Sequence, residues 1–379
     1  MHSAMQKALR RYPYFVFRII KTDSGYDKVE NQLPVVVMDS FDKEIVLGSE
    51  EVNYHWIAAA CEGKELKLIM SFMIADGRSA MRFYKTLLYC YFTEKTGNRL
   101  DPYGILLPDS GISPDEDVKV YGIMDGEDNT RRNTVEDPFM IPDAVEDPMK
   151  AYFYKLTVSE KEFLSYSKDS NNSPLTLTTV FMAKMFQDVY PDNEKTIYAG
   201  VGIDARDALN CPESRFTNVY VIFVKHSPSD LDQGLKDLGT MTRGQIAVQS
   251  EKEIVRYVHN SVIRISGQIQ SSTDPMEKQR LSYEIYKLVT SNPAYAVSYV
   301  GKPEWGSLEP FIDEEYTIIF GDKLQLELNA AGGKFCISWV QGFENDAYVR
   351  NFRDLLQKNG IRCVVSGPFL QVRPKCCLP

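Results

Sequence analysis

A proline- and acid-rich stretch from Asp101 to Met149 divides the chain into two parts of unequal length. Its six prolines and a repeated Val-Glu-Asp-Pro sequence favour extended, solvated backbone over helix or strand. A chain of 379 residues is long for one hydrophobic core, so the stretch predicts two lobes joined by a crossover. We place the first lobe at residues 1–125, the crossover at 126–149 and the second lobe at 150–379.

Composition narrows the class of protein. Hydrophobic residues make up 44% of the chain and charged residues 25%, which is typical of a globular protein in solution. The formal net charge of −9 argues against a nucleic-acid partner. No apolar run approaches the roughly 20 residues of a membrane span. The seven cysteines show no metal-ligand spacing. We therefore expect a cytoplasmic protein with reduced thiols, no bound metal and no membrane partner; its oligomeric state stays open.

Each part mixes strands with helices, which indicates α+β or α/β lobes; we expect α+β. In the first part we expect a helix over 3–11, strands at 14–21, 33–38, 44–48, 54–61 and 66–74, and a helix from Gly77 to about Lys95. In the second part we expect strands at 151–159, 196–206, 218–225, 295–301, 315–321, 324–330, 335–341 and from 362. We expect helices at 159–168, 175–190, 277–288 and 346–358. A further helical region is expected over 230–269, interrupted near Gly239 and Gly244.

The junction between the strand at 66–74 and the helix after it is the most specific local feature. Asp76 is placed to cap the helix, and Gly97 to end it. Gly63 suits the first position of a two-residue hairpin turn, which would set Glu62 opposite Glu65. Continuing that register sets His55 opposite Phe72.

Residues 70–88, MSFMIADGRSAMRFYKTLL, resemble the active-site turn of the chloramphenicol-acetyltransferase-like superfamily, whose signature is H-H-x-x-x-D-G between a strand and a helix. Three more stretches are similar to family passages in the same order: residues 8–19, 201–222 and 295–311. The resemblance covers almost the whole chain. It implies two acetyltransferase-like lobes, each a mixed sheet with helices, with a tunnel or cleft between them. The family's usual first strand has no counterpart here, so either this lineage lacks it or the chain start is late.

The sequence departs from the family at the catalytic position. Aligning Asp76 and Gly77 with the motif puts Ser71 and Phe72 where the two histidines belong, and the second histidine is the family's general base. A positioned base contributes about 10²–10⁴-fold to such a reaction. We expect an acyltransferase-like protein of the condensation-domain or alcohol O-acyltransferase type, with impaired chemistry. It would move an acyl group from a thioester, with coenzyme A thioester as a possible co-substrate, to a small alcohol or amine.

The alternative is a non-catalytic member of the same fold that binds a ligand or a partner. His55 is a candidate relocated base, although it can equally be a residue packed in the sheet. Ser71 is a weaker candidate nucleophile, because no histidine or lysine is evidently paired with it. The resemblance also implies a structural pair between Asp76 and Arg206; otherwise Asp76 is only a helix cap and Arg206 a surface residue.

The resemblance implies that Gly77, Tyr299 and Trp305 bind substrate. Trp305 can stack on a ligand or close over the core. Coenzyme A phosphates would need basic residues, for which Lys302, Arg206 and Arg243 are candidates. No phosphate-binding or nucleophile-elbow motif is present in the sequence, so we expect no tightly bound cofactor.

Overall fold

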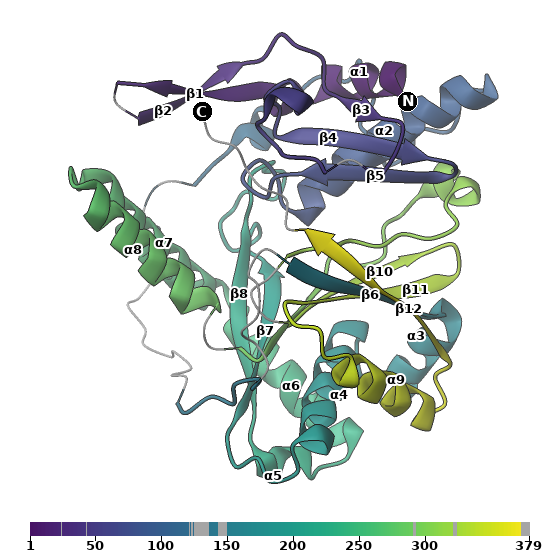
Figure 1. Ribbon diagram of the computed structural model, residues 1–379, viewed down its shortest axis with the longest axis vertical. Helices are drawn as coiled ribbons and strands as arrows, with labels where there is room; N and C mark the ends of the chain where they lie inside the picture. The colour runs from purple at the N-terminus through teal and green to yellow at the C-terminus, as the bar shows by residue number, and fades with distance from the viewer. Residues whose placement is uncertain are drawn as a thin grey trace.

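The computed structural model describes residues 1–23, 25–42, 44–120, 122, 124, 136–142, 150–290, 293–320 and 324–372. Figure 1 shows a smaller N-terminal lobe stacked on a larger second lobe. Each lobe has its own hydrophobic core, and the expected α+β architecture of two lobes is confirmed. The expected lobe boundaries at residues 125 and 149 lie outside the described residues.

The first lobe carries a three-stranded sheet in the order β3-β4-β5, a two-stranded ribbon β1-β2, and two packed helices. In chain order its elements are α1 His2–Arg11, η1 Pro13–Phe15, β1 Phe17–Thr22, β2 Gly25–Glu30, β3 Val37–Met38, η2 Glu50–Val52, β4 Ile57–Glu62, β5 Glu65–Met70, α2 Gly77–Thr96 and η3 Pro114–Asp117.

The β4–β5 hairpin has the expected register, with Glu62 opposite Glu65 and a positive φ of 58° at Gly63. β5 is shorter than expected. It ends at Met70, and the N–H of Ile74 donates to the carbonyl of Ser71 at 3.0 Å, which closes a turn. No strand forms at 44–48, where the N–H of Gly48 instead donates to the carbonyl of His55 at 2.8 Å.

The second lobe is built on a seven-stranded sheet in the order β12-β6-β11-β10-β9-β7-β8, in which β9 runs parallel to both neighbours. In chain order its elements are β6 Lys150–Ser159, α3 Glu160–Asp169, α4 Pro174–Val189, β7 Ile197–Asp204, β8 Val219–His226, α5 Pro228–Leu231, α6 Leu235–Gln249, α7 Lys252–Ser271, α8 Pro275–Thr290, β9 Tyr295–Tyr299, η4 Gly306–Phe311, β10 Leu324–Ala331, β11 Lys334–Gln341, α9 Ala347–Lys358 and β12 Cys363–Val372.

Two expectations for this lobe are wrong in detail. The helices do not break at Gly239 or Gly244, because α6 covers both. Gly239 serves close packing instead: a Cβ there would lie 1.8 Å from the side-chain oxygen of Asn172. Residues 315–320 form no strand, and the N–H of Thr317 donates to the side chain of Asn329 at 3.0 Å instead.

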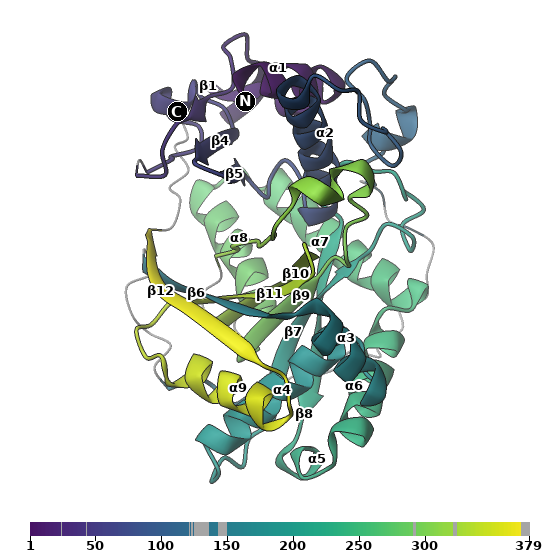
Figure 2. The ribbon, with the colours of Figure 1, turned by 90° about the vertical axis from the view of Figure 1, so that its right-hand side faces the viewer.

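The two faces of the seven-stranded sheet differ. Leu324, Leu326 and Leu328 of β10 point into the core that includes residues of α4 and α9. Ala331, on the opposite face, packs with Leu88 of α2 in the first lobe. Figure 2 shows the sheet between the first lobe above and the helices α3, α4 and α9 below. One face is therefore the core of the second lobe, and the other looks toward the first lobe.

Candidate functional site

Asp76 joins the start of α2 to the second lobe. Its carboxylate caps the helix by accepting the N–H of Ser79 at 3.0 Å. The same carboxylate accepts from Nη2 of Arg206, at 3.0 Å to Oδ1 and 2.8 Å to Oδ2. The backbone N–H of Asn218 donates to Oδ2 at 3.0 Å. Asp76 and Arg206 are 0% and 1% exposed, so the expected contact between them is present and is buried.

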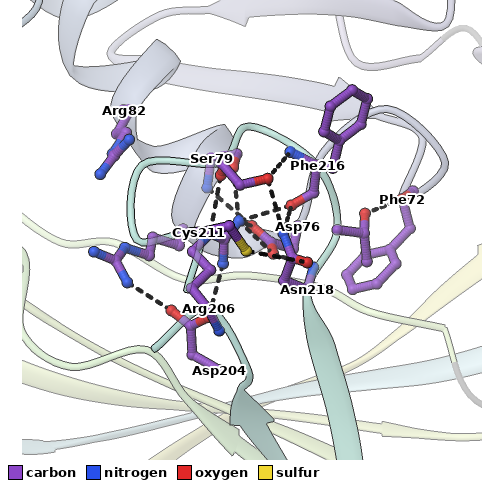
Figure 3. A network of polar contacts seen from close by, with 12 residues as sticks. Phe72, Asp76, Ser79, Arg82, Asp204, Arg206, Cys211, Phe216 and Asn218 are labelled. Carbon is purple, nitrogen blue, oxygen red and sulfur yellow. Dashed lines mark hydrogen bonds and ion pairs between the residues drawn. The ribbon is translucent and has the colours of Figure 1, made fainter. Parts of the chain in front are cut away.

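Every nitrogen of the Arg206 guanidinium has an acceptor. Nε donates to the carbonyl of Ser214 at 2.9 Å, and Nη1 to Asp204 Oδ1 at 3.0 Å. Nη2 also donates to Ser79 Oγ at 3.0 Å and to the carbonyl of Phe216 at 2.8 Å. Figure 3 shows this network at the point where the two lobes meet. Burying a charge is costly unless it is paired and hydrogen-bonded, and here that condition is met.

We call this network around Asp76 and Arg206 the lobe joint. Further contacts also connect the first lobe to the second there. Arg78 pairs with Asp204 at 2.7 Å, and Arg82 with Glu213 at 2.8 Å. Burial raises the pKa of Asp204, but the hydrogen bonds from Arg78 and from Arg206 outweigh it, so its pKa lies below the usual value. Thr217 Oγ1 donates to the carbonyl of Phe72 at 2.8 Å, which ties the turn of the first lobe directly to the second.

Phe72 lies in the turn that follows β5. Its side chain is 51% exposed, and that of Met73 is 58% exposed. In Figure 3 the Phe72 ring lies beside the start of β8, below the turn. Ser71 Oγ accepts the N–H of Met73 at 3.3 Å, a local turn contact. The turn therefore presents two apolar side chains and no group that titrates near neutral pH.

His55 lies inside the first lobe. It is 0% exposed, and its Nε2 is 2.7 Å from the carbonyl of Leu33. Burial lowers its pKa, against a smaller opposing effect of that hydrogen bond. The register that suggested its proximity to Phe72 holds as far as Ile57 and Met70, but the chain then turns at Ser71. His55 therefore packs in the core, which corrects the idea of a relocated base at this position.

Solved structures match nearly the whole chain, whereas no family model and no curated protein matches the sequence. Polyketide synthase associated protein 5 from Mycobacterium tuberculosis superposes with a TM-score of 0.60 at 12% identity, over 94% of this chain and 89% of that one. The epimerization domain from the third module of tyrocidine synthetase B gives 0.55 at 12% identity, over 95% and 88%. F. graminearum TRI101, complexed with coenzyme A and T-2 mycotoxin, gives 0.56 at 11% identity, over 95% and 91%.

The chain has the chloramphenicol-acetyltransferase-like fold. In this acetyltransferase-like fold, Gly77 begins α2 and is exposed. A Cβ at Gly77 would lie 3.3 Å from the Val300 side chain. Since Val300 directly follows β9, the start of α2 sits against the end of a second-lobe strand.

Two of the residues expected to bind substrate lie elsewhere. Tyr299 packs its ring 5.7 Å from that of Phe335, against the core of the second lobe. Because neighbouring strand residues point to opposite faces, Ser298 rather than Tyr299 looks toward the first lobe. Trp305 is 1% exposed and makes an edge contact with Tyr84 of α2 at 6.3 Å. It closes the joint between the lobes, so the expectation that Trp305 stacks on a ligand is corrected, and Tyr299 packs on the core face rather than on the face toward the first lobe.

The three basic residues considered for binding coenzyme A phosphates lie in different parts of the structure. Arg206 is fully engaged in the joint, and Arg243 lies on α6, where it donates to Asn171 at 3.3 Å. Lys302 is 43% exposed and pairs with Glu160 at 2.8 Å. No cluster of metal-binding side chains occurs among the described residues. No helix within those residues is long and apolar enough to cross a bilayer.

Asn218 and Ser79 belong to the joint and were missed in the sequence. Asn218 Nδ2 donates to Ser214 Oγ at 3.0 Å and to the carbonyl of Phe216 at 2.9 Å, which holds the loop around Arg206. The available signal for Ser79 was its position three residues after a capping aspartate, where the cap's partner lies. Asn218 carried only a weaker signal, a polar residue opening a strand.

Proposed function

We propose that this chain transfers an acyl group from a thioester to a small alcohol or amine, without a histidine at position 72. The observation that supports this most directly is the buried pair between Asp76 and Arg206. It holds the Asp-Gly turn and the first turn of α2 against the second lobe in a fold shared with acyltransferases. A turn kept in this shape by four hydrogen bonds to Asp76 is consistent with a retained substrate site.

Phe72 and Met73 would contact the acyl chain, because they expose apolar surface on the turn. Coenzyme A is the donor carrier we propose, since F. graminearum TRI101 was solved with it. Lys302 is the basic residue that we assign to its phosphates: it is partly exposed, pairs with Glu160, and lies two residues beyond Val300, which abuts Gly77 at the start of α2. Substrate positioning alone can lower a barrier by roughly 7–11 kcal/mol. We therefore expect slow but genuine turnover.

The second candidate is a protein that binds an acyl ligand without turnover. The exposed apolar pair Phe72 and Met73, at the position where the family carries its base, favours this candidate. Both candidates predict acyl-chain binding at the joint, and they differ only in chemistry.

Binding and thiol release test the proposal together. Octanoyl-coenzyme A should bind saturably in calorimetry, and thiol release should depend on added alcohol or amine. Val300→Trp should weaken binding by at least about tenfold by crowding the start of α2. Val248→Trp is the matched control, an exposed valine on α6 in the helix layer. Saturable binding without acceptor-dependent thiol release would favour the second candidate. No binding, or equal weakening by both tryptophans, would count against both.

A further inference from the structure

A row of polar side chains crosses the sheet face that looks toward the first lobe. Strand register sets Ser298 of β9, Glu327 of β10, Ser338 of β11 and Lys155 of β6 side by side. The row continues to Gly202 of β7, where a Cβ would lie 3.8 Å from Ser298 Oγ. Directly opposed residues share a face, and neighbouring strands are about 5 Å apart. The polar row therefore spans the centre of the sheet.

Glu327 is the unusual member of this row. It is 5% exposed, accepts from Gln325 Nε2 at 2.8 Å and is hydrogen-bonded to the side chain of Ser298. Among the described residues no lysine or arginine forms an ion pair with it. Lys155, two strands away, is paired with Glu314. Burial raises the pKa of Glu327 to about 7, although the two hydrogen bonds lower it. A carboxyl group in this state can both take and return a proton at neutral pH.

Ser338 adds an unused hydrogen-bonding group beside Glu327. It is 0% exposed, and its Oγ has no hydrogen-bond partner among the described residues. Buried hydroxyl groups are normally satisfied, and leaving one unsatisfied costs about 1–3 kcal/mol. The Ser338 hydroxyl therefore adds an unsatisfied polar group to the row beside Glu327.

The row reaches partly exposed positions at Gly202 and Ser298, next to the buried Glu327. Gly202, Ser298 and Gln325 are partly exposed, whereas Val201 and Val297 on the opposite face are buried. Glycine at 202 leaves the surface of β7 without a side chain at this level. Val300, two residues beyond Ser298, is 62% exposed and abuts Gly77. A ligand held at the start of α2 therefore lies near the partly exposed Ser298, whose side chain is hydrogen-bonded to Glu327.

We propose that Glu327 is the proton acceptor for acyl transfer in this chain and that Ser298 binds the acceptor hydroxyl or amine. The inference rests on the function proposed above and names the group that replaces the missing base. Glu327 lies on the sheet face between the two lobes, whereas His55 is packed in the core of the first lobe.

The step balances with groups already named. The Glu327 carboxylate takes the proton of the acceptor O–H or N–H as that oxygen or nitrogen attacks the thioester carbonyl carbon. The new C–O or C–N bond gives a tetrahedral intermediate, which collapses by breaking the C–S bond. The leaving thiolate takes the proton back from Glu327, and the carboxylate is restored.

A second buried acid provides a matched control. Glu315 is 8% exposed, accepts from Asn329 at 3.3 Å, and its pKa is also raised to about 7, mainly by burial. It lies on the segment that follows η4 and contacts Asn329, which is two residues beyond Glu327 on the same face of β10, so it is outside the row of opposed residues but on the same side of the sheet. Glu315→Gln removes the same charge from a similarly buried position and should leave turnover unchanged.

Thiol release from acetyl- and octanoyl-coenzyme A, with ethanol, hexanol, ethanolamine and hexylamine as acceptors, tests the assignment. Glu327→Gln should lower kcat/KM by at least about 100-fold while calorimetric binding of octanoyl-coenzyme A is unchanged. Glu327→Asp should recover part of the rate. The wild-type rate should rise with pH through an ionisation near pH 7, and the residual rate of Glu327→Gln should not.

The outcomes separate this inference from the proposed function. Wild-type turnover that Glu327→Gln leaves intact would overturn the role of Glu327 and leave acyl transfer standing. Equal losses in Glu327→Gln and Glu315→Gln would also overturn the role, because the effect would then belong to any buried acid. Wild-type protein that binds octanoyl-coenzyme A without acceptor-dependent thiol release would overturn the proposed function and this inference with it.

Discussion

The lobe joint and the polar row each contain a buried carboxylate, and the two carboxylates differ in the groups that donate hydrogen bonds to them. Asp76 receives hydrogen bonds from a guanidinium and two backbone N–H groups, whereas Glu327 receives them only from neutral side chains. A carboxylate bound by arginine and by backbone N–H groups holds the shape of the chain around it. One held by an amide and a hydroxyl in a buried site stays close to protonation. The comparison indicates that Asp76 is structural and that Glu327 is available for proton transfer.

The largest expected effect tests the paired side of this comparison. Arg206→Ala leaves Asp76 buried and unpaired, so the free energy of unfolding should fall by about 3–5 kcal/mol. Urea denaturation followed by circular dichroism measures this. Arg280→Ala is the control, because Arg280 forms its ion pairs on the exposed surface of α8 and should change stability far less. Equal stability of Arg206→Ala and wild type would mean that the joint does not depend on the pair.

The next effect concerns Glu327, the carboxyl group without an ion pair among the described residues, and is seen in how stability depends on pH. The pKa of Glu327 is about 7 in the folded chain, above the usual 4.5, so the unfolded chain releases this proton first as pH rises. The contribution of this raised pKa to the free energy of unfolding is fully present below about pH 4.5 and is lost by about pH 7. The change over this range is roughly 3 kcal/mol. Unfolding free energies of wild type should fall over this window relative to those of Glu327→Gln. Parallel pH curves for the two proteins would contradict a raised pKa.

A smaller effect concerns the turn. Phe72→His places an imidazole of unperturbed pKa near 6.5 in the turn, at the position that the resemblance aligns with a catalytic histidine. The Phe72 side chain is half exposed, so an imidazole there would be little constrained. We therefore expect thioester cleavage to rise by no more than about tenfold, below the usual gain from a positioned base. His55→Ala should leave the rate of the folded protein unchanged. A gain of three orders of magnitude in Phe72→His would show that the site has kept its shape for histidine and would weaken the role of Glu327.

The smallest expected effect comes from removing one of the hydrogen bonds that Arg206 makes in the lobe joint. Ser79 Oγ accepts one of several hydrogen bonds from Arg206, which keeps other acceptors when this one is removed. Ser79→Ala should therefore cost only about 1 kcal/mol in the free energy of unfolding. A loss as large as that of Arg206→Ala would mean that the hydroxyl, rather than the ion pair, organises the joint.

Much of the fold was readable in the sequence because its elements have clear local signals. Asp76 and Gly97 mark both ends of α2, and the turn at Gly63 fixes the register of β4 and β5. The expected pairing of Asp76 with Arg206 came from the resemblance, since nothing local links two residues 130 positions apart.

The remaining features depend on tertiary contacts. The end of β5 at Met70 could not be read from LKLIMSFMI, where the apolar run continues through the turn. Glu327 carried a signal that was not used: a single acid at the centre of LQLELNA, a strand otherwise rich in leucine. Whether such an acid is paired or left close to protonation depends on the neighbouring strands, which only the fold brings together.

The contact between η4 and α2 has a consequence for synthesis of the chain. Leu88 and Tyr89 are covered by Trp305 and Leu308, and Ser307 donates to the carbonyl of Asp101, 206 residues earlier. At 5–20 residues per second, a ribosome needs roughly 10–40 s to make that intervening segment. The apolar side of α2 therefore emerges long before its cover, and the nascent first lobe must remain uncovered on that side for the interval. A chain whose synthesis stopped before Trp305 would present this surface permanently, as a substrate for chaperones or a seed for aggregation.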